Sequence, residues 1–237
     1  MIDFSSIHHI LSDRVQLMIF VWLFAAMNGY AQAERNSMVS FSGEVSKKIT
    51  SGLETSFQQD LRLNMGKQDF NSVRSSLQLD YALIPKFLKI GTVYTFRYRL
   101  NDDGYYQSRH RWAFHANLKQ MINFDWSASL RFRYQTTYRE VYYKEYKVNP
   151  KNCLRTKLGL GYDFRGSRWS YGASVEPYIY LNHQEKPLCD KLRYQVDADY
   201  RLGRYATLCG YIRFDKEIQV KEPVNLLIIG FIYKYKL

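Results

Sequence analysis

The chain has 237 residues, a formal net charge of +12 and 16% aromatic residues, among them 21 Tyr. This length suits one large β domain, and no Pro/Ser-rich linker or change in composition indicates a second. A mean hydropathy of −0.42 argues against a helical membrane protein, whereas a β-barrel with a polar lumen can span a bilayer at that average. The sequence contains no RNP-like, zinc-finger or helix-turn-helix motif, so we expect no nucleic-acid partner.

The N-terminal residues have the order of a signal peptide. Arg14 precedes an apolar run at 15–27, and Ala31-Gln32-Ala33 follows as a small-residue cleavage site. The run is shorter than the roughly 20 residues that a spanning helix needs, which leaves an uncleaved helical anchor as the alternative. We expect a signal peptide at 1–33 that is cleaved near Ala33, and a mature domain at 34–237.

Eleven segments after this run alternate apolar and polar residues. In the clearest of them, Tyr94 and Phe96 share one parity, while Arg97 and Arg99 share the other. Successive side chains of a strand point to opposite faces, so one face is apolar and the other basic. Aromatic residues near the strand ends suit the girdles at the two interfaces of a membrane. The predicted strands are 38–47, 52–63, 71–83, 87–100, 107–119, 124–138, 153–164, 169–182, 190–202, 205–215 and 224–236.

The connections between these strands alternate between tight turns and longer polar loops. Short turns of outer-membrane barrels face the periplasm, and long loops face outside. The sequence therefore predicts an all-β fold, an antiparallel up-and-down transmembrane barrel of 10 to 12 strands in the bacterial outer membrane. The tight turns are 47–52, 84–87, 120–123, 165–168 and 202–204, and the loops are 64–70, 101–104, 139–152, 182–188 and 216–223.

The odd count of strands is the open point of this prediction, because bacterial single-chain barrels have an even number. Eleven strands require a parallel pair between the first and the last. A twelfth strand, or displacement of the first segment to leave ten, would restore an even number. The last strand is apolar on both faces at 226–229, so we expect it to contact a plug or a neighbouring loop as well as lipid. Barrel insertion machinery commonly recognises such a terminal strand.

Short phrases along the mature chain carry a resemblance to a known family. They are 43–48, 53–63, 89–98, 109–112, 130–135 and 230–235. In these stretches the chain resembles a family of uncharacterised Bacteroidota outer-membrane proteins, the domain of unknown function 2490. The resemblance implies an outer-membrane barrel, and it supplies no activity and no catalytic residue.

Hairpin pairing predicts a concentration of cations on the lumen side of the wall. We expect Arg74 opposite Arg97 across the turn at 84–87, and similar pairs across the next connections: Arg97 with Arg111, Arg99 with Arg109, Arg109 with Arg133, Arg111 with Arg131, and Arg155 and Lys157 beside Arg133 and Arg131. Further round, Arg193 is expected opposite Arg213. We call the nine candidate residues the arginine belt: Arg74, Arg97, Arg99, Arg109, Arg111, Arg131, Arg133, Arg155 and Lys157.

Fewer carboxylates are expected beside the belt. The same pairing places Asp60 by Arg74, Glu176 by Lys157 and Asp215 by Lys191, with Asp197 and Asp199 deeper. Two unit charges 4 Å apart repel by about 4 kcal/mol at an effective dielectric constant of 20, so unpaired arginines need water or anions. One interpretation is a narrow anion-preferring pore or a binder of anionic ligands. The other is a closed structural lumen, in which loop acids neutralise the belt: Asp102, Asp103, Glu140 and Glu145.

An enzymatic alternative rests on a predicted pair in the same wall. Hairpin pairing sets His115 opposite Ser127, with Asn117 opposite Asp125, which would suit hydrolysis of a lipid or of lipopolysaccharide. No nucleophile-elbow motif supports it, so we expect a non-enzymatic protein. A soluble lipid-binding barrel is a further alternative.

The three cysteines show no metal-ligand spacing, so we expect no metal and no cofactor. Cys153 and Cys189 fall near loop ends on one rim, which leaves a disulfide between them or unpaired packing as alternatives, and Cys209 lies within a strand. We expect unpaired packing. The expected partners are outer-membrane lipid and lipopolysaccharide, the insertion machinery during biogenesis, and small anions. The sequence names no substrate and no oligomeric state.

Overall fold

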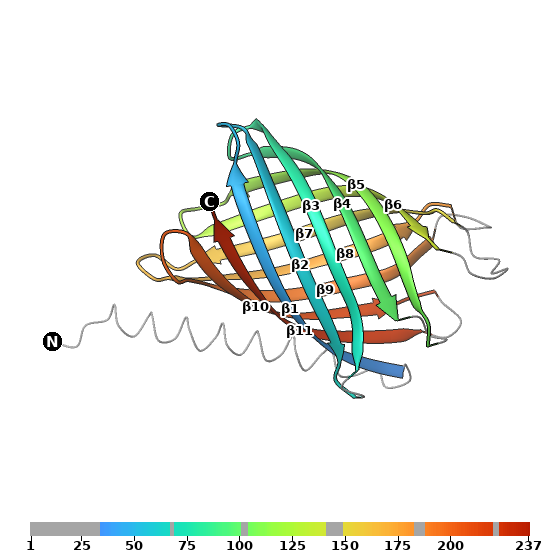
Figure 1. Ribbon diagram of the computed structural model, residues 1–237. Coiled ribbons are helices and arrows are strands. Elements are labelled where there is room, and N and C mark those ends of the chain that lie inside the picture. The colour runs from blue at the N-terminus through green and yellow to red at the C-terminus, as the bar shows by residue number, and fades with distance from the viewer. Residues whose placement is uncertain (1–33, 67–68, 101–103, 141–148, 183–187, 220–222) are drawn as a thin grey trace. The chain divides into compact units, whose positions relative to one another are not determined.

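The computed structural model describes residues 34–66, 69–100, 104–140, 149–182, 188–219 and 223–237, so the predicted signal peptide lies outside the described residues. Within these ranges no helix has the length and apolar character needed to cross a membrane. The described residues form eleven strands (Figure 1). They are β1 (Glu34–Lys48), β2 (Leu53–Asn64), β3 (Phe70–Ile84), β4 (Leu88–Leu100), β5 (Tyr106–Met121), β6 (Trp126–Arg139), β7 (Lys151–Asp163), β8 (Trp169–Tyr180), β9 (Leu188–Arg201), β10 (Ala206–Glu217) and β11 (Val224–Lys236).

The strands close into a barrel in which each strand pairs with its neighbours in sequence and β1 meets β11. Every pair from β1–β2 to β10–β11 is antiparallel, so β1 and β11 run in the same direction, as Figure 1 shows. Across this seam, the Leu237 backbone N–H donates to the Ser46 carbonyl at 2.8 Å. The prediction of a barrel is confirmed, and its odd strand count is accommodated by one parallel pair.

The predicted tight turns gather at one end of the barrel, together with the C-terminus (Figure 1). Two of them use backbone conformations with positive φ, at Lys86 (66°) and Gly166 (73°). The turn between β5 and β6 lies two residues further along the chain than predicted, at 122–125, because β5 continues to Met121 and β6 begins at Trp126. The Asn123 side-chain oxygen accepts from the backbone N–H groups of Asp125 and Trp126, which fixes the turn at this position.

The outer face of the barrel is apolar and exposed. Large side chains such as Phe41, Leu77, Phe132 and Leu158 each expose more than 40% of their surface, as a lipid-facing wall requires. Aromatic side chains contact one another outside the wall near both ends. The contacting groups at the tight-turn end are Trp126, Tyr162, Phe164, Trp169, Tyr171 and Tyr200, and those toward the loop end are Phe70, Tyr94, Phe96, Tyr98, Tyr106, His110 and Trp112.

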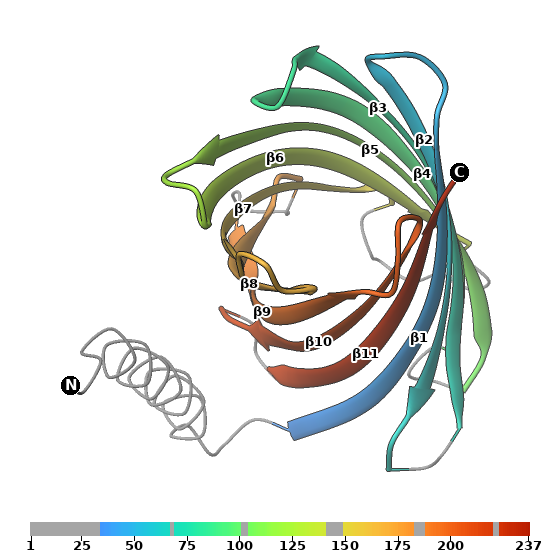
Figure 2. The same ribbon diagram turned by 90° about the vertical axis from the view of Figure 1, so that its left-hand side faces the viewer.

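The inner face has an apolar cluster at the seam. Met38 of β1, Tyr211 of β10 and Ile228 of β11 pack together inside the barrel, with Leu226 and Ile232 against them. Figure 2 shows these three strands side by side. The run at 226–229 is therefore apolar on its inner face because it packs on neighbouring strands, and this packing closes the wall where the pairing is parallel.

Candidate functional site in the barrel lumen

All nine residues of the arginine belt lie on the inward parity of their strands. The register confirms three of the predicted neighbours: Arg74 with Arg97, Arg133 with Arg155, and Arg131 with Lys157. The belt therefore crosses five consecutive strands, from β3 to β7.

Three predicted registers are wrong. Arg97 faces Arg109, and Arg99 faces Gln107, which is a shift of two residues along β5. Arg109 faces Arg139 rather than Arg133, because the displaced turn at Asn123 moves the centre of that hairpin. Consequently, Arg131 and Arg133 lie opposite Asn117 and His115, nearer the tight turn than predicted. Arg193 faces Asp215, and Arg213 faces Gln195.

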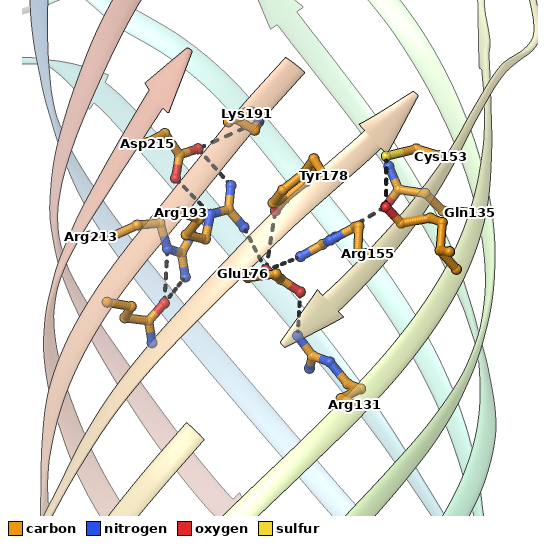
Figure 3. A network of polar contacts seen from close by, with 12 residues as sticks. Arg131, Gln135, Cys153, Arg155, Glu176, Tyr178, Lys191, Arg193, Arg213 and Asp215 are labelled. Carbon is orange, nitrogen blue, oxygen red and sulfur yellow. Dashed lines mark hydrogen bonds and ion pairs between the residues drawn. The ribbon is translucent and has the colours of Figure 1, made fainter. Parts of the chain in front are cut away.

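Glu176 on β8 is the centre of a buried network inside the lumen (Figure 3). Its carboxylate accepts from Arg155 at 2.7 Å and from Arg131 at 3.0 Å, and the Tyr178 hydroxyl donates to it at 3.4 Å. Arg193 lies 3.8 Å away, and Glu176 is only 3% exposed. The β7–β8 register runs from Arg155 opposite Tyr178 to Leu158 opposite Val175, so Lys157 lies level with Glu176 as predicted, although no ion pair joins the two among the contacts of the described residues.

Asp215 on β10 extends this network across the next two strands. Arg193 donates to both of its oxygens at 2.6 Å, in the bidentate geometry that favours arginine–carboxylate pairs. Lys191 lies 3.6 Å from the same carboxylate, as the sequence predicts. The ring of Tyr178 lies beneath the cations of Arg155, Lys191 and Arg193, at 4.3, 4.3 and 5.0 Å from its centroid. Aromatic and carboxylate partners together hold these cations in place.

Asp60 on β2 forms a second, separate cluster. It pairs with Arg74 at 3.2 Å, as predicted, and with Arg62 at 3.0 Å. The hydroxyls of Ser40 and Ser42 donate to it at 2.8 and 2.9 Å, and only 1% of it is exposed. Arg62 and Tyr178 are network residues that the sequence prediction missed, although both have the inward parity that would have identified them.

Three arginines of the belt have no carboxylate partner among the described residues. Arg97 donates to the Ser72 hydroxyl at 3.4 Å, and Arg111 donates to the Thr137 hydroxyl at 3.2 Å. Arg133 makes no side-chain hydrogen bond within the described ranges. The Nε atoms of Arg97 and Arg133 are buried without a partner there. These three residues lie on the consecutive strands β4, β5 and β6.

The loop acids proposed to neutralise the belt fall largely outside the described residues, namely Asp102, Asp103 and Glu145. Glu140 is described, and its carboxylate accepts from the Ser108 hydroxyl. Arg109 donates to the Gln107 side chain at 3.1 Å, and both Arg99 and Arg109 have further interactions.

The predicted His115–Ser127 pair is wrong. Ser127 faces Met121, whereas His115 faces Arg133. His115 instead reaches over β4 to Asp80 on β3, with 2.9 Å between its Nε2 and the carboxylate. Gly91 lies between them, where a Cβ atom would stand 2.6 Å from the Leu79 carbonyl and 2.9 Å from the imidazole. The hydrolase interpretation thus loses the geometry on which it rested.

The cysteines are all unpaired. Cys153 and Cys209 are buried, and Cys189 is half-buried. No disulfide therefore joins the β7 and β9 ends of the barrel.

A cavity of about 440 Å³ opens on the tight-turn side of the network. Arg131 and Lys157 belong to both the belt and the cavity lining. The lining comes from β5 to β9 and the adjoining turns, and it includes Asn117, Lys119, Asp125, Ser127, Ser129, Gly159, Gly161, Asp163, Gly172, Ser174, Asp197 and Asp199.

Comparison with known proteins identifies a family. No curated protein matches this chain. Among solved structures, a NanC porin is 13% identical with a TM-score of 0.47, over 76% of this chain and 86% of that chain. The beta domain of the Bordetella autotransporter Brka is 12% identical with a TM-score of 0.39, over 76% of this chain and 82% of that chain. A family model described as "Protein of unknown function (DUF2490)" matches residues 37–214. Since this match covers more than half of the chain, the protein belongs to the DUF2490 family.

Proposed function

We propose that this protein is a non-enzymatic outer-membrane β-barrel whose lumen forms a narrow, anion-preferring pore. The exposed apolar wall with aromatic groups near both ends supports residence in a bilayer. Outer-membrane lipid and lipopolysaccharide would contact this wall, and the insertion machinery would recognise β11 during assembly.

The observation that carries the proposal is the set of unpaired inward arginines. The Asp60, Glu176 and Asp215 carboxylates are shared among Arg62, Arg74, Arg131, Arg155, Lys191 and Arg193. Arg97, Arg111 and Arg133 remain without a carboxylate among the described residues. Inward arginines in a narrow lumen attract anions and repel cations, and guanidinium groups bind carboxylate and phosphate groups in bidentate geometry.

Conductance of the folded, purified protein in planar bilayers tests the proposal. We expect small stepwise currents and, across a KCl gradient, a reversal potential that shows preference for chloride. The double variant Arg97→Glu plus Arg111→Glu should lose or reverse this preference, because it exchanges two lumen cations for anions. Arg168→Gln, on an exposed tight turn, removes a cation away from the lumen and should leave the reversal potential unchanged.

Two outcomes would overturn the pore. The absence of any current from folded barrels would favour the closed structural lumen, for which the networks at Glu176 and Asp60 provide a specific basis. Chloride preference that survives in the double glutamate variant would show that Arg97 and Arg111 do not select the ion.

A further inference from the structure

The cavity on the tight-turn side of the lumen exists because the residues that line it there have short side chains. At its inward positions, β6 carries Ser127 and Ser129, β7 carries Gly159 and Gly161, and β8 carries Gly172 and Ser174. Larger inward residues would fill a barrel of this width. The small residues therefore leave room, about 440 Å³, beside the tightly packed network at Glu176.

Most charged groups that line this cavity already have partners. Asp125 pairs with Arg165, Asp163 with Arg201, and Asp199 with Lys234. Arg131 also has a partner, because it pairs with Glu176.

Lys157 and Asp197 differ from these groups, because each is half-buried in the lining without an ion pair among the described residues. Within the described ranges Asp197 accepts a single side-chain hydrogen bond, from Gln195 at 3.2 Å. A buried charge without a counter-ion is costly, so both groups require water or a ligand.

These two half-buried charges lie on either side of β8. Lys157 is on β7 and Asp197 on β9. Asp197 faces Gly172, which faces Gly161, so Asp197 lies two strand spacings, about 9 to 10 Å, across the sheet from β7 and is displaced along it by four residues from Lys157. Between them, β8 presents Gly172 and Ser174. A Cβ atom at Gly172 would meet the Asp197 carboxylate, with its Cγ at 3.0 Å. Gly172 thus allows the Asp197 side chain to extend over β8. The Lys157 ammonium group and the Asp197 carboxylate therefore lie on either side of the small residues of β8.

We propose that this cavity binds a small zwitterion of the α-amino acid class. The ligand carboxylate is held by Lys157, with Arg131 as the second cation, and the ligand ammonium group is held by Asp197. The Ser174 hydroxyl is available to a polar ligand side chain, and the Ser129 hydroxyl, which donates to the Gly159 carbonyl at 3.5 Å, is available as an acceptor. This site differs from the pore proposed above in requiring both signs of charge, and it does not depend on conductance.

Calorimetric titration of the folded barrel in detergent with three probes tests the proposal. L-Glutamine carries both charges, N-acetyl-L-glutamine lacks the ammonium group, and L-glutaminamide lacks the carboxylate. We expect L-glutamine to bind at least about tenfold more tightly than either analogue, which corresponds to about 1.4 kcal/mol.

Two near-isosteric variants separate the roles of the charges. Asp197→Asn should abolish the preference for L-glutamine over its N-acetyl analogue while the preference over the amide persists. Lys157→Met should have the opposite effect. Lys48→Gln, at the exposed end of β1, is the control and should bind all three probes like the unmodified protein.

The result is interpretable only for folded protein, so heat-modifiable migration in gel electrophoresis is measured for each variant. Equal binding of L-glutamine and its N-acetyl analogue would show a plain anion site and overturn the proposal. Absence of binding by every probe, or discrimination that survives in both variants, would overturn it as well.

Discussion

At the scale of single residues, the lumen is organised by a few buried carboxylates. Glu176 contacts arginines from β6, β7 and β9, and Asp60 contacts arginines from its own strand and from β3. Parity identified these side chains as inward from the sequence, because a strand alternates its faces without exception between bulges. Parity alone does not predict which cation pairs with each carboxylate, because the long arginine side chains reach across more than one strand.

Replacement of Glu176 by glutamine should strongly destabilise the barrel. The substitution keeps the shape but leaves the buried Arg155 and the half-buried Arg131 beside a neutral group, and an unpaired buried charge costs about 3 kcal/mol or more. Unfolding of the barrel from lipid vesicles by urea, followed by tryptophan fluorescence, measures the change. Asp163→Asn removes one partner of an exposed pair with Arg201 and should cost less than about 1 kcal/mol. Equal losses in the two variants would contradict the structural role of Glu176.

At the scale of elements, the predicted strands agree with the observed ones to within a few residues. The predicted segment 87–100 corresponds to β4, Leu88–Leu100, and 205–215 corresponds to β10, Ala206–Glu217. Alternation is a local property of the sequence and therefore reports the strands well. The pairing between strands was less predictable, because it depends on where each hairpin turns. The Asn123 turn illustrates this, since its side-chain hydrogen bonds shift the register of β5 with β6.

The seam between β1 and β11 should depend on its inner apolar cluster. Ile228 is fully buried inside the barrel against Met38 and Tyr211, whereas its neighbour Ile229 has the outward parity. Ile228→Ala loses the transfer free energy of the removed atoms and also leaves a cavity, whereas Ile229→Ala loses the transfer term alone. We expect Ile228→Ala to reduce the free energy of unfolding by at least about 1 kcal/mol more than Ile229→Ala.

The same urea titration in vesicles compares these two variants. A loss at Ile229 that equals or exceeds the loss at Ile228 would mean that inner packing does not hold the parallel pair together.

At the scale of the whole molecule, closure was the property that the sequence left open. The count of strands follows from local patterns, but the contact between β1 and β11 joins the two ends of the barrel domain and has no local signal. The structure resolves it through the Leu237–Ser46 backbone bond and the packing of Met38 on Ile228. The lumen within this closed wall is uneven, since one side is filled by charged networks and the tight-turn side holds the cavity.

The alternation of turns and loops predicts how the whole barrel would be oriented in the outer membrane that we propose as its location. Short turns face the periplasm in such barrels. We therefore expect the turn containing Gly166 to face the periplasm and the loop end at Tyr105 to face the cell exterior. Both positions are exposed, with Tyr105 showing 74% of its surface and Gly166 lying in a turn with φ of 73°. An epitope inserted after Tyr105 should bind antibody on intact cells, whereas the same epitope after Gly166 should bind only after the outer membrane is permeabilised. Labelling of the Gly166 insertion on intact cells would reverse the orientation, and the cavity proposed to bind zwitterions would then open to the cell exterior instead of the periplasm.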